Sequence, residues 1–228
     1  QKIIGSEVRN LAKRRNVSCN FNQRLRINPL QEMKYKEKEK LWLSKIKQNK
    51  NSNWKFKGWF IFRNLNDFFY SASFYVSLKE NKISGYLCFK PMNIDNVFWD
   101  IIDEQPKKKM PLSFRGEAAF CIREVNFHKY NIEISDILNP EKEIEELLTE
   151  IDKIVNQKSN EIKDNNDFRL EMLKNEETNS VGIITLYVEE NKFTEALNKI
   201  TEYRDKKYNS GFGFGDEDFY DLAEKYIK

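Results

Sequence analysis

Few residues in this 228-residue chain have the types and spacing of a catalytic site. Cys121 and His128, the chain's single histidine, are seven positions apart, which matches no zinc-binding pattern. A cysteine and a histidine brought together by the fold can form a nucleophile, because the imidazole accepts the thiol proton. The simpler interpretation is that Cys121 is a buried structural residue and that His128 lies at the end of a strand. We therefore predict no catalytic residue, no bound metal and no cofactor.

Acidic residues leave a metal-dependent nuclease as one alternative. Such an enzyme holds its metal ions with carboxylates that share one face, usually with a lysine nearby. Glu117 and Glu124 lie close to basic residues in the segment GEAAFCIRE. Their separation is odd, however, and puts them on opposite faces of a single strand. The sequence therefore ranks a nuclease below a binding function.

The segment NSGFGFGDEDF, residues 209–219, has the glycine content of a phosphate-binding loop. A nucleotide-binding loop follows a strand and opens a helix whose N-terminus faces the phosphate. Here the segment follows a predicted helix, and the acids at positions 216–218 would repel a phosphate. We interpret it as a joint before a last helix capped by Asp216. Phe212 and Phe214 then attach the joint to the core, or contact a partner if they are exposed.

Aromatic and basic side chains gather on one face of a predicted β-sheet. Trp59, Arg63, Tyr75, Tyr86 and Lys90 fall opposite the apolar stripes of their strands. Such a face can stack the bases of single-stranded nucleic acid. It is equally typical of a protein-binding surface, since tryptophan, tyrosine and arginine are hot-spot residues. A layer of helices covering the face is the third alternative.

Charge is distributed unevenly along the chain. Residues 1–50 carry 14 Lys and Arg against 4 acids (+10), residues 51–135 carry 12 against 9 (+3), and residues 136–228 carry 13 against 23 (−10). A basic first segment is typical of proteins that bind nucleic acid, although the two ends can also neutralise each other. Arg115, between Phe114 and a glycine, is a further candidate that either binds an anion or stacks on Phe114.

The bulk composition predicts a cytoplasmic protein without a membrane partner. The chain is 39% hydrophobic and 33% charged, and no apolar run approaches the roughly 18 residues of a membrane span. The cysteines at positions 19, 88 and 121 are odd in number and widely spaced. That usage favours a reducing compartment over a disulfide-linked secreted fold.

Apolar periodicity predicts an α+β fold. Alternation between residues 54 and 90 predicts three strands of an antiparallel meander. The segment 116–127 predicts a fourth strand, and the continuous apolar run SVGIITLYV at 180–188 predicts one added, buried strand. Helices are predicted over 31–48, 93–102, 140–161 and 193–203, and from 216 onward. We expect an antiparallel sheet of four to five strands packed with helices, divided into a basic helical segment 1–50, a β-rich core 51–135 and an acidic, helical part 136–228.

The central stretch contains NWKFKGWFIFRNLNDFFYSASFYVSLKE, CFKPMNIDNVFWDII and MPLSFRGEAAF. This arrangement resembles an uncharacterised family of small bacterial proteins of unknown function over residues 53–125. The resemblance implies an α+β fold and a genetic neighbourhood of toxin immunity or phage defence, and it implies no catalytic residues. We expect a non-enzymatic protein that binds and masks a protein partner. The alternative is a nucleic-acid-binding subunit that uses residues 1–50 and the aromatic sheet face.

Overall fold

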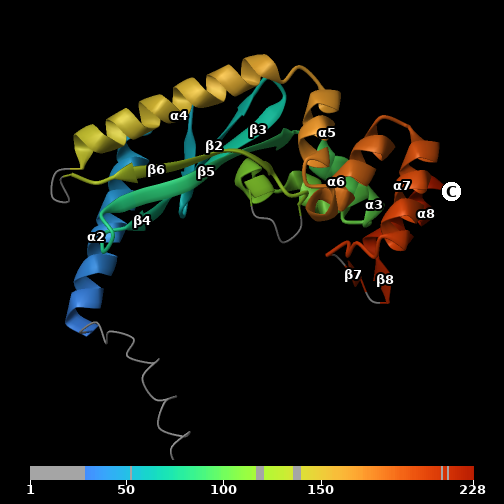
Figure 1. The fold of residues 1–228 in the computed structure, drawn as a ribbon, viewed down its shortest axis with the longest axis horizontal. Helices are drawn as coiled ribbons and strands as arrows, with labels where there is room; N and C mark the ends of the chain where they lie inside the picture. The colour runs from blue at the N-terminus through green and yellow to red at the C-terminus, as the bar shows by residue number, and fades with distance from the viewer. Residues whose placement is uncertain (1–28, 52, 117–120, 136–139, 212, 215) are drawn as a thin grey trace, which may run out of the picture. The chain divides into compact units, whose positions relative to one another are not determined.

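An antiparallel sheet is the central element of the computed structural model (Figure 1). The structure describes residues 29–51, 53–116, 121–135, 140–211, 213–214 and 216–228. The chain divides into two units, residues 1–38 and residues 39–228. Helix α2 (Pro29–Asn49) begins in the first unit and ends in the second. The sheet and all other described elements belong to the second unit.

Six strands form the sheet: β1 (Lys55–Lys57), β2 (Phe60–Leu65), β3 (Phe68–Ser73), β4 (Tyr75–Ser77), β5 (Lys82–Pro91) and β6 (Val125–Glu133). All pairings are antiparallel, in the order β1-β2-β3-β5-β4, and β6 also pairs with β5. β3 pairs with residues 87–91 of β5, and β4 pairs with residues 82–84. β3 and β4 pair with β5 in one register, so they form one of the three strands expected between residues 54 and 90, with an interruption at Phe74. The predicted α+β class is confirmed.

The interruption at Phe74 has a local cause. The backbone N–H of Phe74 donates to the carbonyl oxygen of Trp59 at 2.8 Å, which continues the register of the β2–β3 pair. On the β5 side, the N–H of Tyr86 donates to the Ser73 hydroxyl oxygen at 3.0 Å. The Ser73 carbonyl turns toward Gly85, where an added Cβ would lie only 1.8 Å from its oxygen. The hydroxyl of Tyr130 donates to this carbonyl. Only glycine permits so close an approach of two backbones.

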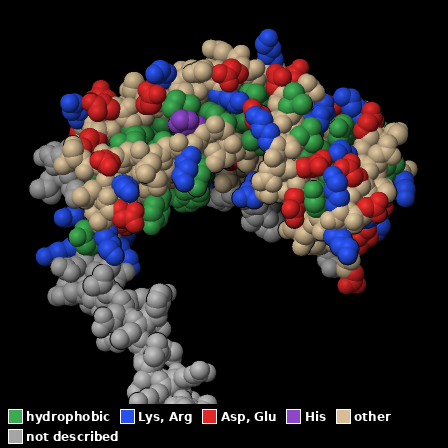
Figure 2. Space-filling view, viewed as in Figure 1, with side chains coloured by type: hydrophobic (Ala, Val, Ile, Leu, Met, Phe, Trp, Pro, Cys, Tyr) green, Lys and Arg blue, Asp and Glu red, His purple; other side chains and the backbone are tan. Residues whose placement is uncertain are grey.

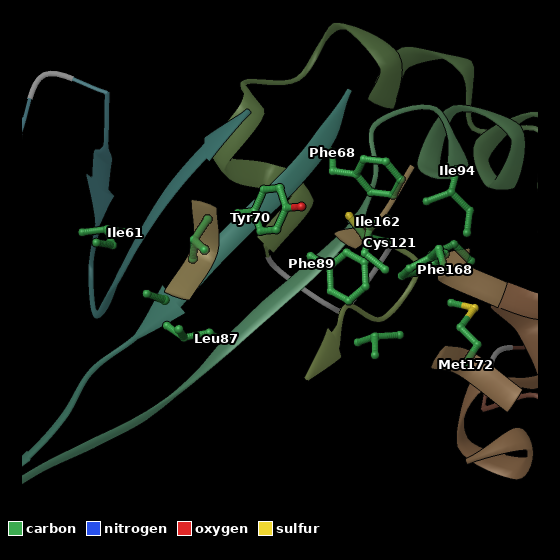
Figure 3. Packing of buried hydrophobic residues seen from close by; sticks show 14 of the residues in the cluster. Ile61, Phe68, Tyr70, Leu87, Phe89, Ile94, Cys121, Ile162, Phe168 and Met172 are labelled. Atoms are coloured by element: carbon green, nitrogen blue, oxygen red, sulfur yellow. The ribbon is translucent and has the colours of Figure 1, made fainter. Parts of the chain in front are cut away.

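One face of the sheet packs on helix α4 (Glu141–Glu161), which crosses it in Figure 1. The helix buries the apolar stripe expected from its sequence, at Ile144, Leu147, Leu148, Ile151 and Val155. Alternate residues of β3, Phe68, Tyr70 and Ala72, enter the same core. Figure 3 shows this packing from close by, with Phe89 of β5 beside Phe168, and their ring centroids are 5.2 Å apart.

The C-terminal third is helical. Its helices are α5 (Asn165–Leu173), α6 (Glu176–Glu189), α7 (Phe193–Asp205) and α8 (Phe219–Ile227), and α6 also packs against α3 (Ile94–Ile101). The strand expected at 180–188 is wrong, because these residues lie within α6. α6 packs against helices α3, α5, α7 and α8, so it is apolar around most of its circumference. A helix buried on all sides and a buried strand have the same continuous apolar sequence.

Two further boundaries differ from expectation. The strand expected at 116–127 begins later than expected: Gly116 ends a short 3-10 helix (Leu112–Gly116), residues 121–124 are in no strand, and β6 starts at Val125. Residues 117–120 lie outside the described part of the chain. The backbone at Ile122 is bonded to Asp95 instead of to a strand. The last helix is capped by Asp218 and not by Asp216, and Asp218 and Asp221 form a reciprocal capping box. A two-stranded ribbon, β7 (Gly213–Phe214) and β8 (Glu217–Asp218), precedes this helix.

Candidate functional site

The sheet face opposite α4 bears a cleft of about 910 Å³. Its lining includes Trp59, Phe60, Ser71, Ser73, Tyr75, Tyr86, Cys88, Arg123 and Glu124. Trp59, Tyr75 and Tyr86 are 57%, 70% and 44% exposed, as the expected aromatic face requires. They come from the turn before β2, from β4 and from β5. Figure 2 shows hydrophobic side chains reaching the surface below the sheet in that view.

Arg63 was expected on this open face, and that expectation is wrong. It faces α4, where its guanidinium donates to Asp152 and to Asn156, both at 2.8 Å, and lies 4.5 Å from the ring centroid of Trp54. Burial lowers the pKa of Arg63, and the charge of Asp152 opposes the shift. The phenylalanines of β2 misled the assignment of its faces: Phe60 and Phe62 are on the open side.

Those phenylalanines form a second, smaller cluster. Phe60, Phe62 and Phe69 pack together under Met92 and Leu112. The segment of residues 92–116 therefore covers this end of the open face. The cleft lies beside it, where serines replace phenylalanines along β3. One part of the open face is therefore buried and the other part is exposed in the cleft. The alternation of polar and apolar residues along the strands does not show where one part ends and the other begins.

Lys90 was also expected on the binding surface, and it is instead fully buried. It lies on the open side of β5, as its position in the strand predicts, but its ammonium donates to Asp95 at 3.0 Å and to the carbonyls of Arg115 (2.6 Å) and Ile122 (2.9 Å). These three acceptors match the three N–H donors of a lysine. Lys90 thus fastens the segment that forms the wall of the cleft.

Arg115 belongs to the same buried network. Its guanidinium donates to Asp95 at 3.2 Å, to the carbonyl of Met92 at 2.8 Å and to Asn96 at 2.8 Å. It lies 5.0 Å from the ring centroid of Trp99 and not over Phe114, which was one of the two expected partners. Because its donors are directed at neighbours within the fold, Arg115 acts as a clamp, and an anion-binding role has no support from this geometry.

Glu124 is the carboxylic acid among the described residues that line the cleft, and the sequence had suggested it only as part of a nuclease site. Its carboxylate accepts a hydrogen bond from the Ser71 hydroxyl. Burial raises the pKa of Glu124, despite the opposing charge of Lys90 and the Ser71 hydrogen bond. Burial, together with the negative charge of Glu124, also raises the pKa of the Cys88 thiol to about 12. At neutral pH Cys88 is therefore a thiol and a poor nucleophile.

The Cys121–His128 pair has no support as a nucleophile. The buried Cys121 thiol donates to the carbonyl of Phe114 at 3.1 Å, and no hydrogen bond joins these two described side chains. Burial raises the pKa of Cys121 to about 12. His128 lies in β6, paired with Leu87 of β5. Cys121 is therefore buried as the simpler interpretation expected, whereas His128 lies within β6 and not at the end of a strand.

Other expected features fall partly outside the described residues. Glu117 and Phe212 lie outside them, as does the side chain of Phe214, whose backbone is in β7. Within the described part of the chain, no three histidine, cysteine or acidic side chains are grouped as metal ligands. No helix of the described residues has the length and apolar character of a membrane span.

A second cleft of about 730 Å³ was not expected from the sequence. It lies among the β2–β3 turn, the residues before α3 and the start of α5, and it is lined mainly by polar side chains. Arg169 and Glu190, which form an ion pair at 2.6 Å, are part of its wall. Lys192 also pairs with Glu190 at 2.7 Å, and these paired charges favour a structural role for this wall.

Comparison with known proteins identifies no relative. No protein-family model, no curated protein and no solved structure matches the chain.

Proposed function

We propose that this chain is a non-enzymatic binding protein whose open sheet face receives a segment of a partner protein. The observation that carries the proposal is the exposure of Trp59, Tyr75 and Tyr86 around one cleft. Large aromatic side chains are costly to leave in water, and they supply most of the binding energy when a partner covers them. A cleft with apolar walls and a few polar groups is the usual form of such a site.

The charges around the cleft favour a protein over single-stranded nucleic acid. Of the basic side chains expected on this face, Arg63 instead faces α4, and Lys90 and Arg115 are bonded to groups inside the fold. Arg123 is the exposed cation among the described residues that line the cleft. Glu124 adds a carboxyl group to the cleft, which a phosphate would avoid. Nucleic-acid binding draws its electrostatic driving force from several cations that contact phosphates, and one exposed cation in the cleft supplies little of it. The basic residues 1–28 lie outside the described part, and they keep nucleic acid as the second candidate.

The resemblance of residues 53–125 supplies the first candidate for the partner. It points to a bacterial toxin or a component of a phage-defence system, which this chain would bind and mask. Masking a partner requires binding and no catalytic step. The protonated, weakly nucleophilic thiols of Cys88 and Cys121 agree with such a role.

Affinity capture from host cells with matched variants tests the proposal. Tyr75→Ala combined with Tyr86→Ala removes two exposed rings of the cleft, while Tyr226→Ala removes a ring that is 47% exposed on α8. Loss of one hot-spot ring costs about 2 kcal/mol, or roughly 30-fold in affinity. We expect the double variant to lose the partner and Tyr226→Ala to keep it. Equal capture by both would refute the proposal.

Measuring nucleic-acid binding over a series of salt concentrations distinguishes the second candidate function from the first. Binding of single-stranded RNA or DNA at low salt that falls steeply as salt rises would assign the chain to nucleic acid instead. We expect no such binding that depends on Tyr75 and Tyr86.

A further inference from the structure

Three arginines in the described chain are held in one recurring arrangement. Each guanidinium lies over an aromatic ring and also bonds a carboxylate. They are Arg63 over Trp54 with Asp152, Arg115 over Trp99 with Asp95, and Arg169 over Tyr187 with Glu190. The distances to the ring centroids are 4.5, 5.0 and 5.0 Å. The planar, weakly hydrated guanidinium suits both contacts at once.

The cleft has both kinds of partner, aromatic rings and a carboxylate, among its lining residues. An added Cβ on Gly116 would lie 2.7 Å from the ring of Phe60 and 3.5 Å from Oε1 of Glu124, so the Glu124 carboxyl lies near Phe60. The Phe60 ring in turn contacts that of Trp59, with their centroids 5.4 Å apart. Tyr86 lines the same cleft. Phe60 itself is buried, so the rings open to a ligand here are those of Trp59, Tyr75 and Tyr86, which share the lining of the cleft with Glu124.

No cation of the described residues forms an ion pair with Glu124. Its one hydrogen bond comes from Ser71, and no ion pair of the described chain includes it. Lys90 and Arg115 direct their donors to Asp95 and other neighbours. Arg123 is exposed and also lines the cleft, but it forms no ion pair with Glu124. The face already holds one cation against a ring, because Nζ of Lys129 lies 5.7 Å from the centroid of Tyr86.

We propose that the cleft binds an arginine side chain of the partner protein, its guanidinium lying against an exposed ring and reaching the Glu124 carboxylate. This inference rests on the proposed function, since it assigns the chemistry of the segment that the open face receives. Charge complementarity favours a cation at Glu124. The flat shape of the rings and the strong hydration of an ammonium group favour arginine over lysine.

A displayed library of random dodecapeptides provides the probe. Selection on the wild-type chain, after depletion on the Tyr75→Ala/Tyr86→Ala variant, retains peptides that need the aromatic face. The strongest peptide is then made with its arginine, with lysine and with uncharged citrulline. Binding is followed by protection of tryptophan fluorescence from acrylamide, which reports Trp59 because Trp42, Trp54 and Trp99 are buried.

We expect the retained peptides to share an arginine. Its replacement by citrulline should weaken binding to the wild type by about 10-fold to 100-fold, as for a desolvated charge-assisted pair. In the Glu124→Gln variant the same replacement should weaken binding by less than about threefold, because the carboxylate that the arginine would contact is missing. Glu133→Gln removes the same charge from an exposed position of β6 and should behave as the wild type.

Two results would overturn the inference while leaving the proposed function intact. One is retained peptides without an arginine, or with acidic residues in its place. The other is an equal effect of citrulline in the wild type and in Glu124→Gln. If no peptide depends on the aromatic face at all, the proposed function fails as well.

Discussion

Asp95 holds the wall of the cleft in place, and replacing it with asparagine tests that role. The side chain is fully buried at the start of α3. Its carboxylate accepts hydrogen bonds from Lys90 at 3.0 Å, from Arg115 at 3.2 Å and from the backbone N–H of Ile122 at 2.9 Å. Asp95→Asn keeps the shape of the side chain but leaves the buried Lys90 cation without its counter-charge.

The expected loss is large for a substitution of one atom. Removing one partner of a buried ion pair costs about 3–5 kcal/mol of unfolding free energy. For a chain of this length that loss lowers the melting temperature by roughly 6–20 °C. Asp100→Asn is the matched control, since Asp100 lies on the same helix and pairs at the surface with Lys108. A surface pair of this kind contributes less than about 1 kcal/mol.

Urea denaturation followed by tryptophan fluorescence and circular dichroism measures both variants. A second substitution, Lys90→Met, should recover part of the loss caused by Asp95→Asn, because it removes the unpaired buried charge. The reasoning is refuted if Asp95→Asn and Asp100→Asn cost the same. It is also refuted if the effects of Asp95→Asn and Lys90→Met simply add, since residues of one network should be coupled.

Three further predictions concern the strand break and the titratable groups. Gly85→Ala should destabilise the fold by about 1–3 kcal/mol in urea denaturation, because the new Cβ meets the Ser73 carbonyl, and a change below about 0.5 kcal/mol would contradict this. Since burial raises the pKa of Glu124, its contribution to stability is greatest below the unfolded pKa and is lost as pH rises through the folded pKa. Glu124→Gln should therefore match the wild type near about pH 4 and be increasingly more stable toward about pH 8, whereas a difference that does not vary with pH would contradict the burial of the carboxyl. Cys88 and Cys121, with pKa values of about 12, should react with iodoacetamide at pH 8 at less than about a tenth of their rate in urea, as mass spectrometry of the labelled peptides would show; rapid labelling of native Cys121 would restore the nucleophile hypothesis.

Most of the fold follows from local pattern in the sequence. The alternation of β3 and β5 and the apolar stripe of α4 each have one strong period, and the structure contains these elements where they were expected. The helix at 180–188 was missed because burial on every side removes the period that separates helix from strand. The start of β6 was missed because Ile122, although apolar, is bonded to Asp95 on another element.

The candidate site was predictable only in part, and for a physical reason. Tyr75 and Tyr86 lie on the sheet face that was expected, because alternation within a strand determines the face of a side chain. Trp59 is also exposed there, but it lies in the turn before β2, and the alternation of β2 put Arg63 on the wrong face. Alternation does not determine what covers that face. Lys90 points to the expected side, but its ammonium is bonded to the carbonyls of Arg115 and Ile122 and is buried. Glu124 was not expected at the binding surface, yet it lines the cleft. Its position depends on the path of the chain just before β6, which the sequence pattern does not determine.

Site-specific photo-crosslinking in host cells tests the central claim most directly. A photoreactive phenylalanine replaces Tyr75, which is 70% exposed beside the cleft, or Tyr226, which is 47% exposed on α8. If the open sheet face receives a partner protein, position 75 should give one dominant protein adduct that position 226 does not give. The same adducts from both positions, or adducts to nucleic acid from position 75, would contradict the claim.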